Sequence, residues 1–139
     1  MYDVEESFNR YSRELGSRIL FSPSPGETIK DIRRSIEVSQ DSLSELLLIR
    51  RETVSRIETG VINPTTTFIK RFSKIASIIK VFRDLNALQD TPASEPFELN
   101  ATFLRTHFSL TQTELDTLLK IGNRSYQKTK NKVLRRIQI

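Results

Sequence analysis

The apolar residues near the start of the chain are spaced for one face of a helix. They follow one another at intervals of four and three positions, with polar residues between most of them: Val4, Phe8, Tyr11, Leu15 and Ile19. Because a helix turns once in about 3.6 residues, this spacing predicts an amphipathic helix over residues 3–20. We expect it to form an N-terminal segment of its own, residues 1–21.

The sequence SPSPG at residues 22–26 interrupts this pattern. Its two prolines and its glycine are expected to break the helix rather than continue it. A second amphipathic helix is then predicted from about Glu27 to Glu37. Its inward positions are Ile29, Ile32 and Ile36.

Two more short helices follow, separated by a tight turn. Ser39 is placed to cap the first of them, which leucines anchor in the core at positions 43, 46 and 47. The turn falls at residues 48–50. In the next helix Val54 and Ile57 face inward.

The opposite face of that last helix is polar and carries two arginines. Residues at positions i, i+1, i+4 and i+5 lie together on a helix, and here they are Arg51, Glu52, Ser55 and Arg56. Glu52 is also placed to pair with Arg56 one turn later. Two short helices joined by a tight turn form a helix-turn-helix, and such a ridge fits the major groove of DNA, where arginine reads guanine and glutamate accepts from cytosine.

Composition removes several classes of protein. The 139 residues contain no cysteine and one histidine, His107, so the chain offers neither a disulfide nor a histidine-rich metal site, and a Ser/His/Asp triad is not expected. The acidic N-terminus and the lack of a run of roughly 20 apolar residues predict a cytoplasmic, nucleoid-associated protein without a membrane partner. All of the net charge of +5 falls in residues 97–139, which favours a polyanionic partner.

The segment from Ile29 to Phe72 resembles the Cro/cI-type (XRE family) helix-turn-helix domain. The resemblance rests on SQDSLSELL for the first helix of the motif, RRETVSRIETG for the recognition helix and its end, and NP for the loop beyond. It implies an all-α, lambda-repressor-like fold for a domain over residues 26–89, with double-stranded DNA as the partner.

The resemblance also implies a role for individual side chains. The recognition helix spans about residues 51–59, ends at a left-handed Gly60 and turns its base-reading residues to the major groove: Arg51, Glu52, Ser55 and Arg56. Side chains near the phosphates are Gln40, Arg50, Thr53 and Asn63. Arg33 and Glu58 match an internal salt bridge. Leu48 departs from the family, which has a glycine in this turn, so we expect a slightly different turn or some strain there.

Residues 67–88 are too apolar for a helix with a single buried stripe. One stripe, from Phe68 to Phe82, closes the core of the DNA-binding domain. A second stripe needs a partner, and its members are Ile78, Val81, Leu85 and Leu88. Either the N-terminal helix of the same chain or a second subunit can supply that partner.

Residues 90–100 read as a linker, and residues 101–139 as a basic C-terminal helical module. At an offset of 72 residues, positions 104–121 repeat the pattern of positions 32–49, which suggests a second, degenerate helix-turn-helix. Its DNA-contacting face would hold Gln112, Asn123, Arg124, Gln127 and Lys128. Lys130 and Lys132 stand where the first copy has Glu58 and Gly60, so the second copy lacks both the internal ion pair and the glycine cap. The module therefore either contacts DNA itself, mainly through phosphates, or serves dimerisation and stability.

These observations predict a sequence-specific, double-stranded DNA-binding transcriptional regulator. We expect a homodimer or tandem domains, no cofactor, no metal and no enzymatic activity, since the chain lacks a glycine-rich phosphate loop and clustered carboxylates. A nonspecific nucleic-acid-binding protein and an antitoxin-like or coactivator-like protein-interaction module remain as alternatives. The sequence does not identify the target site, the regulated genes, the sign of regulation or an effector.

Overall fold

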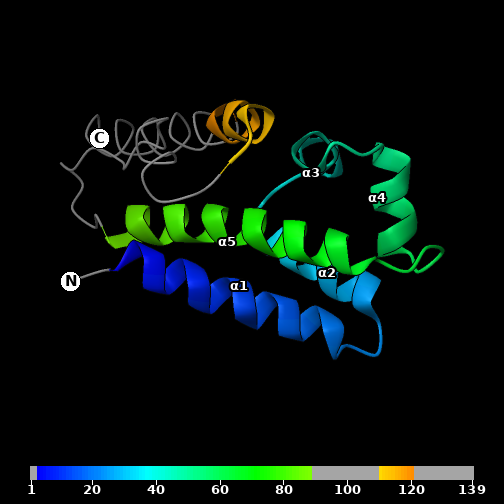
Figure 1. The fold of residues 1–139 in the computed structure, drawn as a ribbon. Coiled ribbons are helices and arrows are strands. Elements are labelled where there is room, and N and C mark those ends of the chain that lie inside the picture. The colour runs from blue at the N-terminus through cyan, green and yellow to red at the C-terminus, as the bar shows by residue number, and fades with distance from the viewer. Residues whose placement is uncertain (1–2, 89–109, 121–139) are drawn as a thin grey trace, which may run out of the picture. The chain divides into compact units, whose positions relative to one another are not determined.

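The computed structural model of the chain describes residues 3–88 and 110–120, and every regular element in these ranges is a helix. The first range holds five helices (Figure 1): α1 (Val4–Leu20), α2 (Pro25–Ser35), α3 (Gln40–Leu47), α4 (Arg51–Glu58) and α5 (Thr66–Leu88). Residues 112–120 form a further helix. The expected all-α fold is therefore confirmed for the described residues, and α3 and α4, joined by a short turn, form a helix-turn-helix.

Side-chain caps set the start of two helices, and the one at Ser39 was predicted from the sequence. Asp3 accepts a hydrogen bond from the backbone N–H of Glu6 at 3.0 Å, and Ser39 accepts one from Ser42 at 3.0 Å. Each bond satisfies a backbone donor that the helix itself leaves without a partner. The predicted cap at Ser39 thus fixes the first residue of α3.

The start of α2 differs from the sequence prediction by two residues. Pro25 and Gly26 belong to the helix and do not precede it. Proline is well suited to the first helical position, because its missing N–H has no partner there in any case and its φ is already helical. The SPSPG segment therefore contains the last residues of the turn after α1 and the first two residues of α2.

The middle of α5 is buried on most of its sides. Phe72, Ile75 and Ile78 are each at most 1% exposed, and even Ser77 is fully buried. Burying a side chain of this size contributes roughly 1.5–3 kcal/mol, so α5 supplies much of the core energy. This accounts for the unusually apolar sequence of residues 67–88.

Helix α1 runs beside α5 (Figure 1), and side chains of the two helices meet. The ammonium group of Lys80 lies 4.7 Å from the ring centroid of Tyr11. At Gly16 a Cβ atom would lie 3.7 Å from the Ser73 hydroxyl, an ordinary packing distance. The N-terminal helix therefore belongs to the body of the first domain and is not a separate segment in space.

The first two members of the second apolar stripe of α5 are buried. Ile78 and Val81 are 1% and 0% exposed in the single chain. The side chains of Leu85 and Leu88 lie outside those that the structure describes. The choice between the N-terminal helix and a second subunit as the partner of this stripe stays a prediction.

The chain divides into two compact units, Met1–Lys80 and Val81–Ile139. The boundary falls within α5, whereas the sequence suggested a linker at residues 90–100, which lie outside the described ranges. No helix in residues 3–88 or 110–120 is both long enough and apolar enough to cross a membrane.

The helix in the described part of the second unit begins at a hydroxyl cap, as α3 does at Ser39. Thr111 caps it: the Thr111 hydroxyl accepts from the N–H of Glu114 at 3.2 Å, and the Glu114 carboxylate accepts from the N–H of Thr111 at 3.1 Å. This reciprocal pair is a capping box. Leu115 and Leu118 are buried, as are Leu43 and Leu46 in α3 at positions 72 residues earlier. The second helix-turn-helix itself stays a prediction.

Candidate nucleic-acid interface

The inner face of α4 is packed against the domain, and its outer face is open to solvent. Val54 is fully buried and Ile57 is 4% exposed. The polar side chains outside this packed face are exposed or half-buried. The exposed ones are Arg50, Arg51, Glu52 and Arg56, and the half-buried ones are Thr53 and Ser55. The structure thus places five of the six polar residues singled out at positions 50–56 on one short, accessible helix, and the sixth, Arg50, at its N-cap.

The turn before α4 contains a leucine in a left-handed conformation. Leu48 has φ 55° and ψ 43°, and its side chain is 64% exposed. The backbone N–H of Ile49 donates to the carbonyl of Ser44 at 3.1 Å, which closes the end of α3. Of the two outcomes expected for this position, the structure has the strained one: the turn keeps a glycine-like geometry and the leucine adopts it.

The end of α4 is closed by a glycine. Gly60 has φ 83°, its N–H donates to the Ile57 carbonyl at 3.2 Å, and the N–H of Val61 donates to the Arg56 carbonyl at 2.9 Å. These two bonds form the Schellman motif, which satisfies the last carbonyls of a helix. The chain then turns to the exposed Asn63, one of the residues expected near phosphate.

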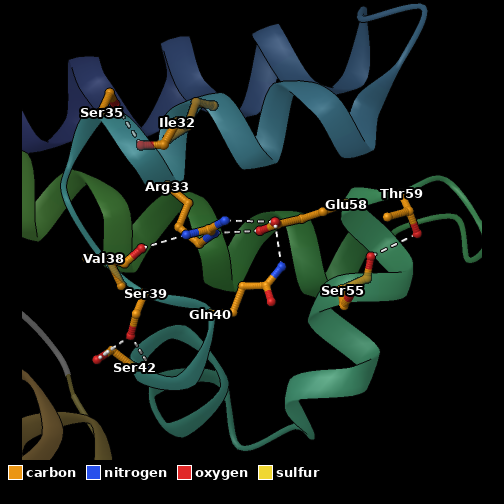
Figure 2. A network of polar contacts seen from close by, with 10 residues as sticks. All are labelled: Ile32, Arg33, Ser35, Val38, Ser39, Gln40, Ser42, Ser55, Glu58 and Thr59. Atoms are coloured by element: carbon orange, nitrogen blue, oxygen red, sulfur yellow. Dashed lines mark hydrogen bonds and ion pairs between the residues drawn. The ribbon is translucent and has the colours of Figure 1, made fainter.

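A buried polar network ties three helices together behind α4. Figure 2 shows Arg33 of α2, Gln40 of α3 and Glu58 of α4 converging on one point. Nε and Nη2 of Arg33 donate to the two carboxylate oxygens of Glu58 at 2.7 and 3.0 Å, and Nη1 donates to the Val38 carbonyl at 2.9 Å. Loss of one partner from such a pair costs about 3–5 kcal/mol, because the other charge is left buried without compensation. The pair therefore fixes how α4 is oriented on the domain.

Gln40 takes part in this network. Its Nε2 donates to Oε1 of Glu58 at 3.0 Å, and the side chain is partly buried. The resemblance implied a phosphate contact for Gln40. In the structure its side-chain amide donates a hydrogen bond to Glu58 within the domain. A phosphate near the start of α3 would instead meet the backbone N–H groups of the first turn.

The charges on the outer face do not pair as the sequence suggested. Within the described residues, no ion pair joins Glu52 to Arg56. Instead, Nε of Arg51 lies 3.6 Å from Oδ1 of Asp41 in the first turn of α3. Asp41 was not singled out from the sequence, because its proximity to Arg51 depends on the angle between α3 and α4.

A second feature missed from the sequence is the contact between α2 and α4. A Cβ atom on Gly26 would lie 2.1 Å from the carbonyl oxygen of Ile57, so only glycine permits the backbones to approach this closely. The available signal was a glycine near the start of a helix, which lowers helix propensity and therefore needs another reason to be there.

The suggested second DNA-contacting face is described at one position only. Nε2 of Gln112 donates to Oδ1 of Asp116 at 2.9 Å, one turn along the same helix. The aligned Gln40 instead reaches Glu58, and Lys130 stands at the position equivalent to Glu58. The remaining members of that face, Asn123, Arg124, Gln127 and Lys128, lie outside the described residues.

Comparison with known proteins gives one match. Residues 29–76 match a family model described as helix-turn-helix, of the Cro/cI type, which confirms the resemblance that the sequence carries. The matched stretch contains α3, α4, most of α2 and the first half of α5. Comparisons with curated proteins and with solved structures find no match to the chain.

Proposed function

Because residues 29–76 form a helix-turn-helix domain of the Cro/cI-type (XRE) family of DNA-binding transcriptional regulators, we propose that the chain binds double-stranded DNA sequence-specifically. In this proposal α4 enters the major groove. The protein acts by occupying its site on the nucleoid in the cytoplasm rather than by catalysing a reaction, and a bound protein changes transcription by blocking or recruiting polymerase.

The observation that carries the proposal is the polar face of α4 on a rigid support. The buried Val54 and Ile57, the Arg33–Glu58 pair and the Gly26 contact each fix the helix to the domain. Side chains that read base edges must be held in a defined position, and residues on a firmly packed helix satisfy that requirement. The proposed base-reading residues are Arg51, Glu52, Ser55 and Arg56.

Contacts to the phosphates would set the register of the helix in the groove. Exposed Arg50 precedes α4, Thr53 lies on its first turn and Asn63 lies beyond its end, so together they flank the proposed base-reading face. Contacts of this kind add affinity on every sequence and depend strongly on salt. Gln40 would contribute through the backbone at the start of α3, since its side chain binds Glu58.

Replacement of Arg51 by alanine tests the proposal. We expect Arg51→Ala to weaken binding to the preferred duplex by about 1–3 kcal/mol and to relax the preference at one base pair, because a paired arginine–guanine contact is lost. The measurement is a titration of labelled duplexes by fluorescence anisotropy. Arg18→Ala, which removes an exposed arginine from the last turn of α1, is the matched control and should leave the base preference unchanged.

Two outcomes would contradict base reading by Arg51. One is an equal loss of affinity on preferred and unrelated duplexes, which would make the arginine a general phosphate contact. The other is a preference that survives Arg51→Ala at every position. A protein that shows no preference before substitution would instead be a nonspecific nucleic-acid-binding protein.

We also propose that two DNA-binding units act together, either as a homodimer or as the two units of one chain. Domains of this type bind half-sites about one helical turn apart. The capping box at Thr111 and the buried leucines that follow it support a second helix that begins like α3. The second unit would contact DNA mainly through phosphates, using its basic residues around Asn123, Arg124, Gln127 and Lys128.

A further inference from the structure

An acidic residue lies directly beside the proposed base-reading arginine. Asp41 belongs to the first turn of α3, and its Oδ1 is 3.6 Å from Nε of Arg51, the first residue of α4. The pair therefore spans the two helices of the motif. Within residues 3–88 and 110–120, no other acidic side chain forms an ion pair with Arg51.

This pair is too exposed to be explained by stability. The side chains of Arg51 and Asp41 are 62% and 68% exposed. Water and salt screen charges in such positions, so an ion pair of this kind adds little to folding. The two helices are held by their buried residues, among them Leu46 and Val54, which are both fully buried.

The geometry of the pair suits an arginine that recognises a base. A guanidinium is planar, with Nε on one side and two terminal nitrogens at the end. Guanine is recognised when two donors of an arginine meet its O6 and N7. Because the Asp41 carboxylate lies on the Nε side of the guanidinium at an ion-pair distance of 3.6 Å, both terminal nitrogens of Arg51 remain available, and the attraction favours orientations that keep Nε towards α3.

The charge of Asp41 has a second effect. Its carboxylate stands in the first turn of α3, next to the backbone N–H groups that would meet a phosphate. A negative charge there repels the DNA backbone whatever the sequence. The benefit of orienting Arg51, by contrast, is gained only where a guanine is present.

We propose that Asp41 is a positioning residue for specificity: it orients Arg51 towards guanine and at the same time lowers affinity for DNA of unrelated sequence. The inference rests on the proposed function, in which Arg51 reads a base. It adds a residue that contacts no base and yet affects which base is preferred.

Asp41→Asn separates the two effects, because asparagine keeps the size of the side chain and removes its charge. The full chain is titrated against three duplexes: the preferred one, the same duplex changed at the base pair that Arg51→Ala ceases to distinguish, and an unrelated one. Discrimination between the first two should fall by about three- to fivefold. Binding to the unrelated duplex should tighten by about twofold as repulsion is removed.

Two controls complete the experiment. Asp31→Asn removes the same charge from an exposed position of α2 and should leave discrimination unchanged. In the Arg51→Ala background, Asp41→Asn should cause no further loss of discrimination, because the group to be oriented is absent. Thermal unfolding of each variant shows that the fold is intact.

The proposal is overturned if Asp41→Asn changes affinity for all three duplexes by the same factor, since Asp41 would then act only through its charge. It is also overturned if the substitution lowers discrimination equally with and without Arg51. If the unmodified chain has no preferred duplex, or Arg51→Ala relaxes no base pair, the proposed function itself fails and this inference fails with it.

Discussion

At the scale of single residues, the turn of the motif depends on a leucine in a conformation that favours glycine. Leu48 has φ 55° and most of its side chain is exposed, so little packing offsets the strain. A left-handed conformation costs a residue with a Cβ atom roughly 1–2 kcal/mol. The fold bears this cost because the core leucines of α3 and the packing of α4 determine where the turn must lie.

Leu48→Gly should therefore stabilise the domain. Glycine removes the strain but adds freedom to the unfolded chain, so the expected net gain in the free energy of unfolding is about 0.5–1 kcal/mol. Leu48→Ala keeps a Cβ atom and serves as the control, with no gain expected. Urea denaturation followed by circular dichroism measures both variants. Equal stability of the glycine and alanine variants would contradict the assignment of strain to this turn.

The sequence indicates the strain at Leu48 but not its form. The resemblance showed that a glycine is expected in the turn, and it left a different turn or a strained one as the two possibilities. Glu37 also has a positive φ, of 54°, and nothing in the sequence marks it. Single backbone angles of this kind follow from the packing of the helices on either side, which a local pattern does not contain.

At the scale of helices, α2 and α4 are joined by a close approach of their backbones. A Cβ atom at Gly26 would meet not only the Ile57 oxygen at 2.1 Å but also the Glu58 oxygen at 3.1 Å. Neither backbone atom can move without shifting the end of α4. The contact thus links the start of α2 to the proposed recognition helix.

A matched pair of glycine substitutions tests this contact. Gly26→Ala should destabilise the domain by about 1–3 kcal/mol, because the helices must separate to admit the methyl group. Gly16→Ala in α1 meets only the Ser73 hydroxyl, at 3.7 Å, and should stabilise the domain by about 0.5–1 kcal/mol through helix propensity. Thermal denaturation of both variants is the measurement. A Gly26→Ala variant as stable as the original chain would show that α2 and α4 are not held this closely.

Helices were the part of the structure most open to prediction from sequence. Apolar spacing and caps such as Ser39 placed α3 and α4 closely, whereas α2 both begins and ends two residues earlier than predicted, at Pro25 and Ser35. The partners of Gln40 and Arg51 were not predicted. Each depends on the distance between side chains of different helices, and that distance is set by the tertiary packing.

At the scale of the whole molecule, the chain combines one well-described DNA-binding domain with a second unit of related pattern. The register of α3 recurs at residues 111–118, with a cap and two buried leucines in equivalent places. In the sequence, Lys130 stands at the position equivalent to Glu58, so the aligned residues would not form the ion pair of the first unit. Two units of unequal kind would favour a DNA site with unlike halves, whereas a homodimer would favour a palindrome.

The most direct test of the account is selection of bound duplexes from a random DNA pool at moderate salt, followed by sequencing. The account predicts enrichment of two half-sites about ten base pairs apart, with a guanine whose enrichment disappears when Arg51→Ala is used in the same selection. Symmetric half-sites would indicate a homodimer, and unlike half-sites the two units of one chain. Salt-sensitive binding without any enriched sequence would contradict the account, because α4 would then supply charge without reading bases.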